Sequence, residues 1–178
     1  MAIKPGITSL VVALGFSTGF IYAAIKDLKT ESNHEPVIVA QPPMEAISYL
    51  DYINEWTQDF TISMVEFETQ TLELNQNPKL YADKKVMDTY SEVINEIIAL
   101  TTDLIVYPID SNSEYSQAHE HFKESAIAYN QAMTSMWNVA TFYQLDVNSD
   151  IIDESFERSI SQLKAGMSHF QSGVSALH

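Results

Sequence analysis

The sequence predicts an all-α protein in which an N-terminal transmembrane helix is followed by an antiparallel up-down four-helix bundle. Three observations predict this class. A stretch near the N-terminus carries no charge over a length that spans a bilayer. Apolar residues then recur at steps of three and four, and no segment alternates apolar and polar residues as a half-buried strand would. We divide the chain into a transmembrane signal anchor at 1–26, a linker at 27–43 and a four-helix bundle at 44–178.

The anchor is the segment Pro5–Ile25, whose 21 residues include no charged side chain. At about 1.5 Å of rise per residue, a helix of this length crosses a hydrocarbon core of about 30 Å. Small residues suited to signal peptidase lie inside the apolar run or are poorly spaced. This favours an uncleaved anchor over a cleaved signal peptide.

Lysines at both ends of the anchor leave its orientation nearly balanced under the positive-inside rule. Lys4 precedes the segment, and Lys26 and Lys29 follow it. The acidic, cysteine-free domain behind the anchor favours the outer side of the membrane. We therefore expect a single-pass protein of the cell membrane with its C-terminal domain outside.

Two glycine motifs overlap within the anchor. Gly15 and Gly19 form G-x-x-x-G, a face on which membrane helices pack closely and which would allow a homodimer. The same residues also spell the G-x-S-x-G elbow of hydrolases. That elbow requires a strand, a turn and a helix, whereas this segment is an apolar helix, so we interpret the match as coincidence.

Four amphipathic stripes follow a linker that ends in two prolines. Each stripe is long enough for a helix, and each break is short, which suits antiparallel neighbours in a bundle. Proline breaks the first two stripes because the residue before proline avoids the helical region. Ser111 and Glu114 predict a capping box before the third stripe. The stripes span residues 53–74, 87–104, 115–143 and 152–177, with breaks at Asn77-Pro78, at Pro108 and at 146–149.

The acidic charge of the chain limits the classes of partner that the domain is expected to bind. The sequence has 9 basic and 24 acidic residues, and the part after residue 26 keeps seven basic and all 24 acidic residues, a formal charge of −17. Such a domain repels phosphate backbones, so no nucleic-acid partner is expected. Cations, basic proteins and basic envelope polymers fit better, although an acidic surface also simply aids solubility. The absence of cysteine excludes disulfides, thiolate metal sites and a lipobox anchor.

One candidate metal site lies at the break before the fourth stripe. Asp146, Asn148, Asp150 and Glu157 match the first, third, fifth and twelfth positions of an EF-hand calcium loop. The sixth position is Ile151, where that loop needs glycine for a sharp turn. The alternative interpretation is that Ser149 or Asp150 caps the fourth helix.

A second polar cluster opens the third stripe. His121 and Glu124 lie one helical turn apart, whereas His119 and His121 point about 200° apart. The cluster is either a solvated helix face or a divalent-cation site. The Glu-x-x-His pairing of di-iron bundles occurs only at Glu31 and His34, in the linker, so we expect no cofactor. The cluster comprises Glu114, His119, Glu120, His121 and Glu124.

Two further patterns allow two interpretations each. Ser159, Gly166 and Gly173 repeat at seven-residue spacing, which indicates close approach of another helix or room for a ligand. An aromatic line beside the first stripe indicates core packing or a partner surface. This line comprises Tyr49, Tyr52 and Trp56.

Part of the helical region resembles small uncharacterised cell-surface proteins of Gram-positive bacteria. The similar segments are the helix start Tyr115-Ser116-Gln117-Ala118-His119-Glu120-His121-Phe122 after Pro108, and the break Asn77-Pro78-Lys79-Leu80-Tyr81. The resemblance implies a helical bundle at the cell surface and transfers no catalytic residue. Such proteins usually carry a lipobox cysteine, which this chain lacks, so a spanning helix takes the place of a lipid anchor.

These observations favour a membrane-anchored extracytoplasmic bundle with a non-enzymatic binding role toward a protein or cell-envelope partner. No catalytic constellation stands out in the sequence, so we do not expect an enzyme. The alternative is a sensor-like domain that binds a small ligand or a divalent cation. Its site would be the Asp146–Glu157 loop or a groove at Gly166 and Gly173.

Overall fold

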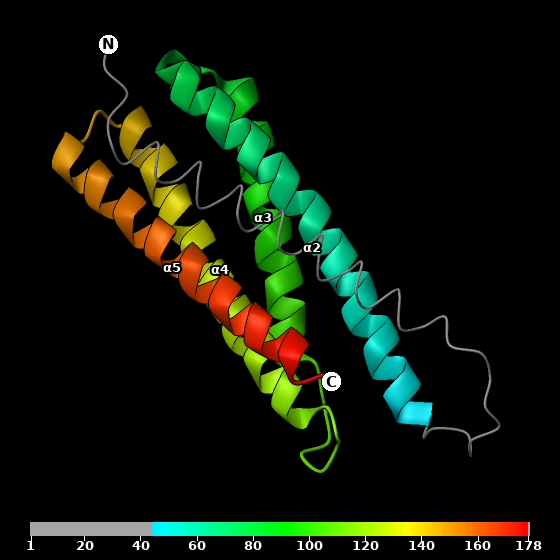
Figure 1. Ribbon diagram of the computed structural model, residues 1–178. Helices are drawn as coiled ribbons and strands as arrows, with labels where there is room; N and C mark the ends of the chain where they lie inside the picture. Colours follow the sequence, from blue (N-terminus) through cyan, green and yellow to red (C-terminus); the bar gives the residue numbers. More distant parts are fainter. Residues whose placement is uncertain (1–43, 178) are drawn as a thin grey trace.

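The computed structural model describes residues 44–177, with side chains from Tyr49 onward. Four long helices fill this range, no strand occurs within it, and successive long helices run in opposite directions (Figure 1). The prediction of an all-α, up-down set of four helices is therefore confirmed. The elements are α2 (Met44–Gln76), the short 3₁₀ helix η1 (Pro78–Ala82), α3 (Lys84–Val106), α4 (Ser116–Gln144) and α5 (Ser149–Ser175).

The anchor prediction falls outside the described residues. Pro5–Ile25, with Gly15 and Gly19, lies in this undescribed part, as do the linker and the Glu31–His34 pair. Within residues 44–177, none of the helices combines the length and the apolar character that crossing a bilayer requires.

Proline ends α2 as predicted, but the chain does not pass directly into the next helix. Pro78 instead begins η1, a 3₁₀ turn that the sequence analysis did not anticipate and that buries Tyr81. Asp83 then caps α3, because its carboxylate accepts hydrogen bonds from the amides of Lys85 and Val86.

The predicted caps of the last two helices are wrong in detail. Ser111 and Glu114 form no capping box, because α4 begins only at Ser116, after a turn in which the Ser113 amide donates to the carbonyl of Asp110. Asn148, rather than Ser149 or Asp150, caps α5 through its side-chain oxygen, which accepts from the Asp150 amide.

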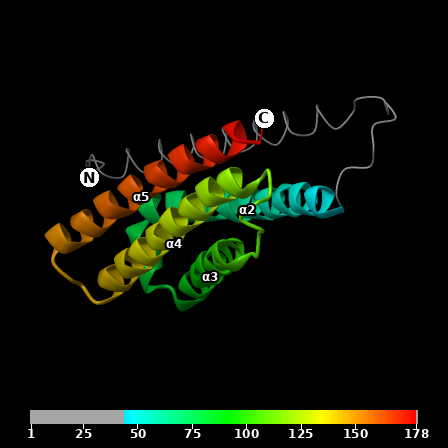
Figure 2. The same ribbon diagram turned by 90° about the horizontal axis from the view of Figure 1, so that it is seen from below.

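The helices pack mainly against their neighbours in sequence. Figure 2 shows α4 between α3 and α5, and α4 and α5 share the longest interface. In the described part of the chain, no α-carbon of α2 lies within 8 Å of one in α4 or α5. Helix α2 reaches α4 through side chains instead, as where the ring centres of Phe60 and Tyr129 lie 4.8 Å apart.

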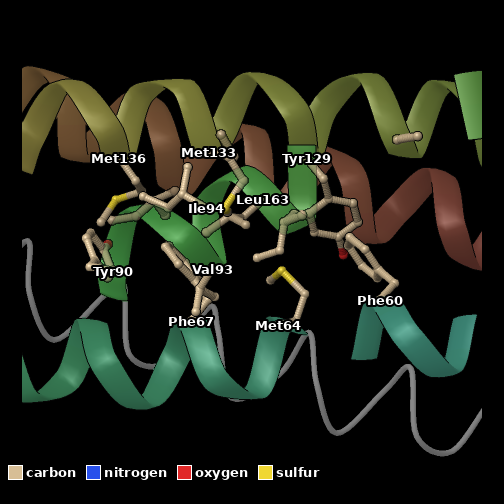
Figure 3. Close-up of a cluster of buried hydrophobic side chains, with 14 of the residues drawn as sticks. Phe60, Met64, Phe67, Tyr90, Val93, Ile94, Tyr129, Met133, Met136 and Leu163 are labelled. Atoms are coloured by element: carbon tan, nitrogen blue, oxygen red, sulfur yellow. The ribbon is translucent and has the colours of Figure 1, made fainter. Parts of the chain in front are cut away.

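One continuous apolar core fills the space between the helices. Figure 3 shows side chains of α2, α3 and α4 converging there, with Leu163 added from α5. Burying each large apolar side chain contributes about 1.5–3 kcal/mol. The fully buried members with the greatest volume are Tyr90, Tyr129, Phe60, Phe67, Phe122, Phe170, Ile53, Met64 and Leu74.

The line of small residues on α5 is a close-packing surface. A Cβ on Gly166 would lie 2.9 Å from the ring of Tyr129, and one on Gly173 would lie 2.8 Å from the ring of Phe122. The Ser125 hydroxyl also donates to the Gly166 carbonyl at 2.8 Å. Aromatic rings of α4 therefore occupy the space beside both glycines, so the predicted close approach is confirmed and the alternative ligand groove there is wrong.

The aromatic line on α2 belongs to the core. Tyr49 and Trp56 are each 4% exposed, and the Trp56 indole donates to the Leu100 carbonyl at 2.7 Å. Tyr52 is half-buried and stacks on Tyr107, with ring centres 3.8 Å apart. Core packing is confirmed over a partner surface.

We expect Gly166→Ala to destabilise the protein by about 1–3 kcal/mol, because the added methyl group must displace the buried ring of Tyr129. The sign is informative, since glycine to alanine in an unobstructed helix stabilises by about 1 kcal/mol. Urea unfolding measures the change. Ser161→Ala, at an exposed position of α5, is the control and should be neutral or slightly stabilising; an equal gain in Gly166→Ala would contradict the packing.

Candidate functional site

Tyrosines surround one histidine near the start of α4. His119 is 2% exposed, and its Nδ1 lies 3.3 Å from the hydroxyl of Tyr49. Tyr49 also stacks on Tyr115, with ring centres 5.4 Å apart, and Tyr107 lies 6.0 Å from both Tyr49 and His119. These aromatic groups pack on one another, so the cluster joins the start of α2 to the start of α4.

Burial sets the protonation states in this cluster. It lowers the pKa of His119, an effect that Glu120 opposes and Lys123 reinforces. It raises the pKa of Tyr52 to about 12, with Asp103 adding to the effect, and raises the pKa of Tyr49 further. Tyr49 and Tyr52 therefore remain protonated at neutral pH, and the neutral form of the His119 imidazole is favoured.

A second group of side chains, each of a type that can bind a metal ion, lies together on the outer side of the α4–α5 interface. The Oε2 of Glu124 lies 3.7 Å from the Nδ1 of His121 and 2.9 Å from the Nδ1 of His169. All three ligand atoms lie within 4.8 Å of one another. The sequence paired His121 with Glu124 correctly, but it missed His169, which comes from α5. The position of His169 between Gly166 and Gly173, beside the close-packing line, was the signal that could have indicated it.

The rest of the predicted cluster does not join these three residues. His119 is buried, whereas His121 is not, in keeping with the predicted separation of about 200° between the two side chains. Glu120 instead lies 3.9 Å from the Nζ of Lys123. Glu114 precedes α4 and is exposed.

The residues of the calcium-loop prediction occupy the turn before α5 and the helix itself. Asp146 has a positive φ of 52°, and Asn148 uses its side chain as the helix cap. Asp150 and Glu157 both lie within α5, about 10 Å apart along its axis at 1.5 Å per residue. The structure therefore places Asp146 and Asn148 at the turn, Asp150 in the first turn of α5, and Glu157 about two turns further along the helix. Calcium binding stays a prediction.

Two depressions mark the surface of the described part. One of about 460 Å³ lies between the start of α4 and the end of α5, lined by Gln117, His121 and Ser168 among others. The second, of about 260 Å³, lies at the turn between these helices, lined by Asp146, Asp153 and Tyr143 among others.

The outward face of α2 combines exposed apolar and acidic side chains. Ile62, Val65 and Leu72 are 66%, 48% and 37% exposed, and their spacing of three and seven residues places them on one stripe. An acidic stripe runs beside them, and residues 44–76 contain seven acidic and no basic residues. The exposed acids of that stripe are Asp51, Glu55, Asp59, Glu66 and Glu73.

Comparison of the chain with protein-family models, with curated proteins and with solved structures found no match. The resemblance to Gram-positive surface proteins therefore stays a prediction from the sequence.

We expect the protein to lose stability as the pH falls from 7.5 to 5.5, in part because of His119. Its folded pKa is below the ordinary value of 6.5, so the unfolded chain takes up the proton first and is stabilised relative to the folded state. Urea unfolding at both pH values measures this. His119→Gln can still hydrogen-bond to Tyr49 but does not titrate, so it should show a smaller loss; an equal loss in both proteins would contradict the assignment.

Proposed function

We propose that the protein is a membrane-anchored, extracytoplasmic helical domain with a non-enzymatic role, and that it binds a basic protein or envelope component through the outward face of α2. The observation that carries this proposal is the pairing of three exposed apolar side chains with an acidic stripe on one helix. The uncharged segment Pro5–Ile25 supplies the anchor.

Burial and charge support this choice of surface. Large apolar side chains that line up on an exposed face favour contact with a partner over contact with water. Ile62, Val65 and Leu72 supply such a line, and the acids beside them attract Lys and Arg at the rim of the contact.

The same charges disfavour other occupants of the face. Two copies of a domain with a formal charge of −17 repel each other, so α2 is not expected to pair with α2 of a second copy. A homodimer through Gly15 and Gly19 would form inside the membrane and leaves this face free.

For the α2 face, we expect a photo-reactive benzoylphenylalanine at position 62 to crosslink a partner in cells that express the full chain. The same probe at position 151, exposed on α5, is the matched control and should give little adduct. Glu66→Lys combined with Glu73→Lys should lower the yield at position 62 about tenfold, as loss of two attractive contacts predicts. Glu157→Lys, on α5, should not lower it.

Two results would overturn this assignment. One is an equal adduct yield at positions 62 and 151. The other is an adduct whose partner, identified by mass spectrometry, is a second copy of this chain or an acidic protein.

For the orientation, we expect protease added to intact cells to remove the domain while cytoplasmic marker proteins survive. The anchor should stay in the membrane fraction after a high-salt wash, because 21 uncharged residues hold it by the hydrophobic effect. Immunoblotting against a C-terminal tag follows the loss of the domain in protease-treated cells and the retention of the uncut chain in washed membranes. A domain that is cut only after lysis would show that it faces the cytoplasm.

A further inference from the structure

We infer that His121, Glu124 and His169 form a binding site for a divalent transition metal, with Zn²⁺ as the best-fitting ion. This site lies on the α4–α5 interface and is independent of the α2 face. It also differs from the predicted calcium loop, because two of its three ligands are imidazoles. Imidazole nitrogen suits zinc, copper and nickel, whereas calcium and magnesium take oxygen ligands.

The distances between the ligand atoms fit a tetrahedral ion. Zinc binds histidine nitrogen and carboxylate oxygen at about 2.0–2.2 Å, which places neighbouring ligand atoms about 3.3 Å apart. The two separations from the Oε2 of Glu124, 3.7 Å and 2.9 Å, lie on either side of this value. The ligand atoms of the two histidines lie within 4.8 Å of each other, so rotation of the half-exposed side chains would close the site around an ion.

One of the three proposed ligand atoms is buried without a hydrogen-bond partner. The Nδ1 of His121 is shielded from solvent and has no hydrogen-bond partner, because 3.7 Å to Glu124 is too long for one. Leaving a buried polar atom unpaired is unfavourable, and a metal at this position would satisfy it. Lys123 is the residue before Glu124, but its Nζ lies 3.9 Å from Glu120, which is not one of the three proposed ligands.

The backbone around the site is held rigidly. His169 lies between Gly166 and Gly173, which pack against Tyr129 and Phe122 of α4. Glu124 is adjacent to Ser125, whose hydroxyl donates to the Gly166 carbonyl. The packing of the two helices therefore fixes the backbone positions from which the three side chains reach the ion.

Three protein ligands leave one position of a tetrahedral ion open, as in zinc sites that hold water or a ligand. A depression of about 460 Å³ is lined by His121 and by Ser168, the neighbour of His169, so solvent reaches the edge of the site. The negative charge of the domain raises the local concentration of cations around it.

The test is calorimetric titration of the metal-stripped full chain in detergent with zinc chloride. We expect one zinc per chain in the wild type, and affinity reduced at least tenfold in each of His121→Gln, Glu124→Gln and His169→Gln. These side chains are 34%, 53% and 41% exposed, so the variants should fold, which circular dichroism verifies. Glu120→Gln on α4 is the matched control and should bind as the wild type does, because Glu120 lies beside Lys123 and not in the ligand set.

Two further measurements separate this site from others. Zinc at about one hundred times its dissociation constant should raise the melting temperature of the wild type by on the order of 5 °C, but not that of His169→Gln. Cobalt should give the visible absorption of tetrahedral coordination in the wild type and lose it in Glu124→Gln. Zinc binding that survives in both Glu124→Gln and His169→Gln would overturn the inference. So would heat from calcium with none from zinc.

Discussion

The close approach of α4 and α5 is the constraint on which the rest of the structure depends. Gly166 and Gly173 each make the helical conformation of α5 about 1 kcal/mol less favourable than alanine would. Because neither residue has a Cβ, the rings of Tyr129 and Phe122 can lie directly against the backbone of α5. Because a ring occupies each position, the two helices can pair in only one register. That register determines which side chains at the edges of the interface meet.

Helical phase on α4 sends neighbouring residues into different environments. His119 turns into the core beside Tyr49, where burial lowers its pKa and favours the neutral ring. His121, two residues later, turns to the interface edge and meets Glu124 and His169. The same short stretch therefore supplies a structural contact that ties α2 to α4 and part of the proposed metal site at the interface edge.

The two exposed regions differ in the charge and kind of their side chains. On α2 the acids accompany apolar side chains, a combination that suits a basic partner with an apolar surface. At the α4–α5 edge a single carboxylate stands between two imidazoles, a combination that suits a transition metal. The metal would bridge the two helices that already pack most tightly, so it would reinforce the fold rather than create it.

The sequence by itself determined the four helices and the breaks between them, because an apolar period of three and four residues and the effect of Pro78 are both local. It also placed Gly166 and Gly173 on a packing line and His119 and His121 on opposite sides of α4. The helix caps and η1 could not be predicted as well, since several residues near each break can accept a hydrogen bond from the same backbone amide. Only the tertiary structure decided that His169 joins His121 and Glu124. The two histidines are 48 residues apart in the chain, and only the packing of rings against glycine backbone brings them together.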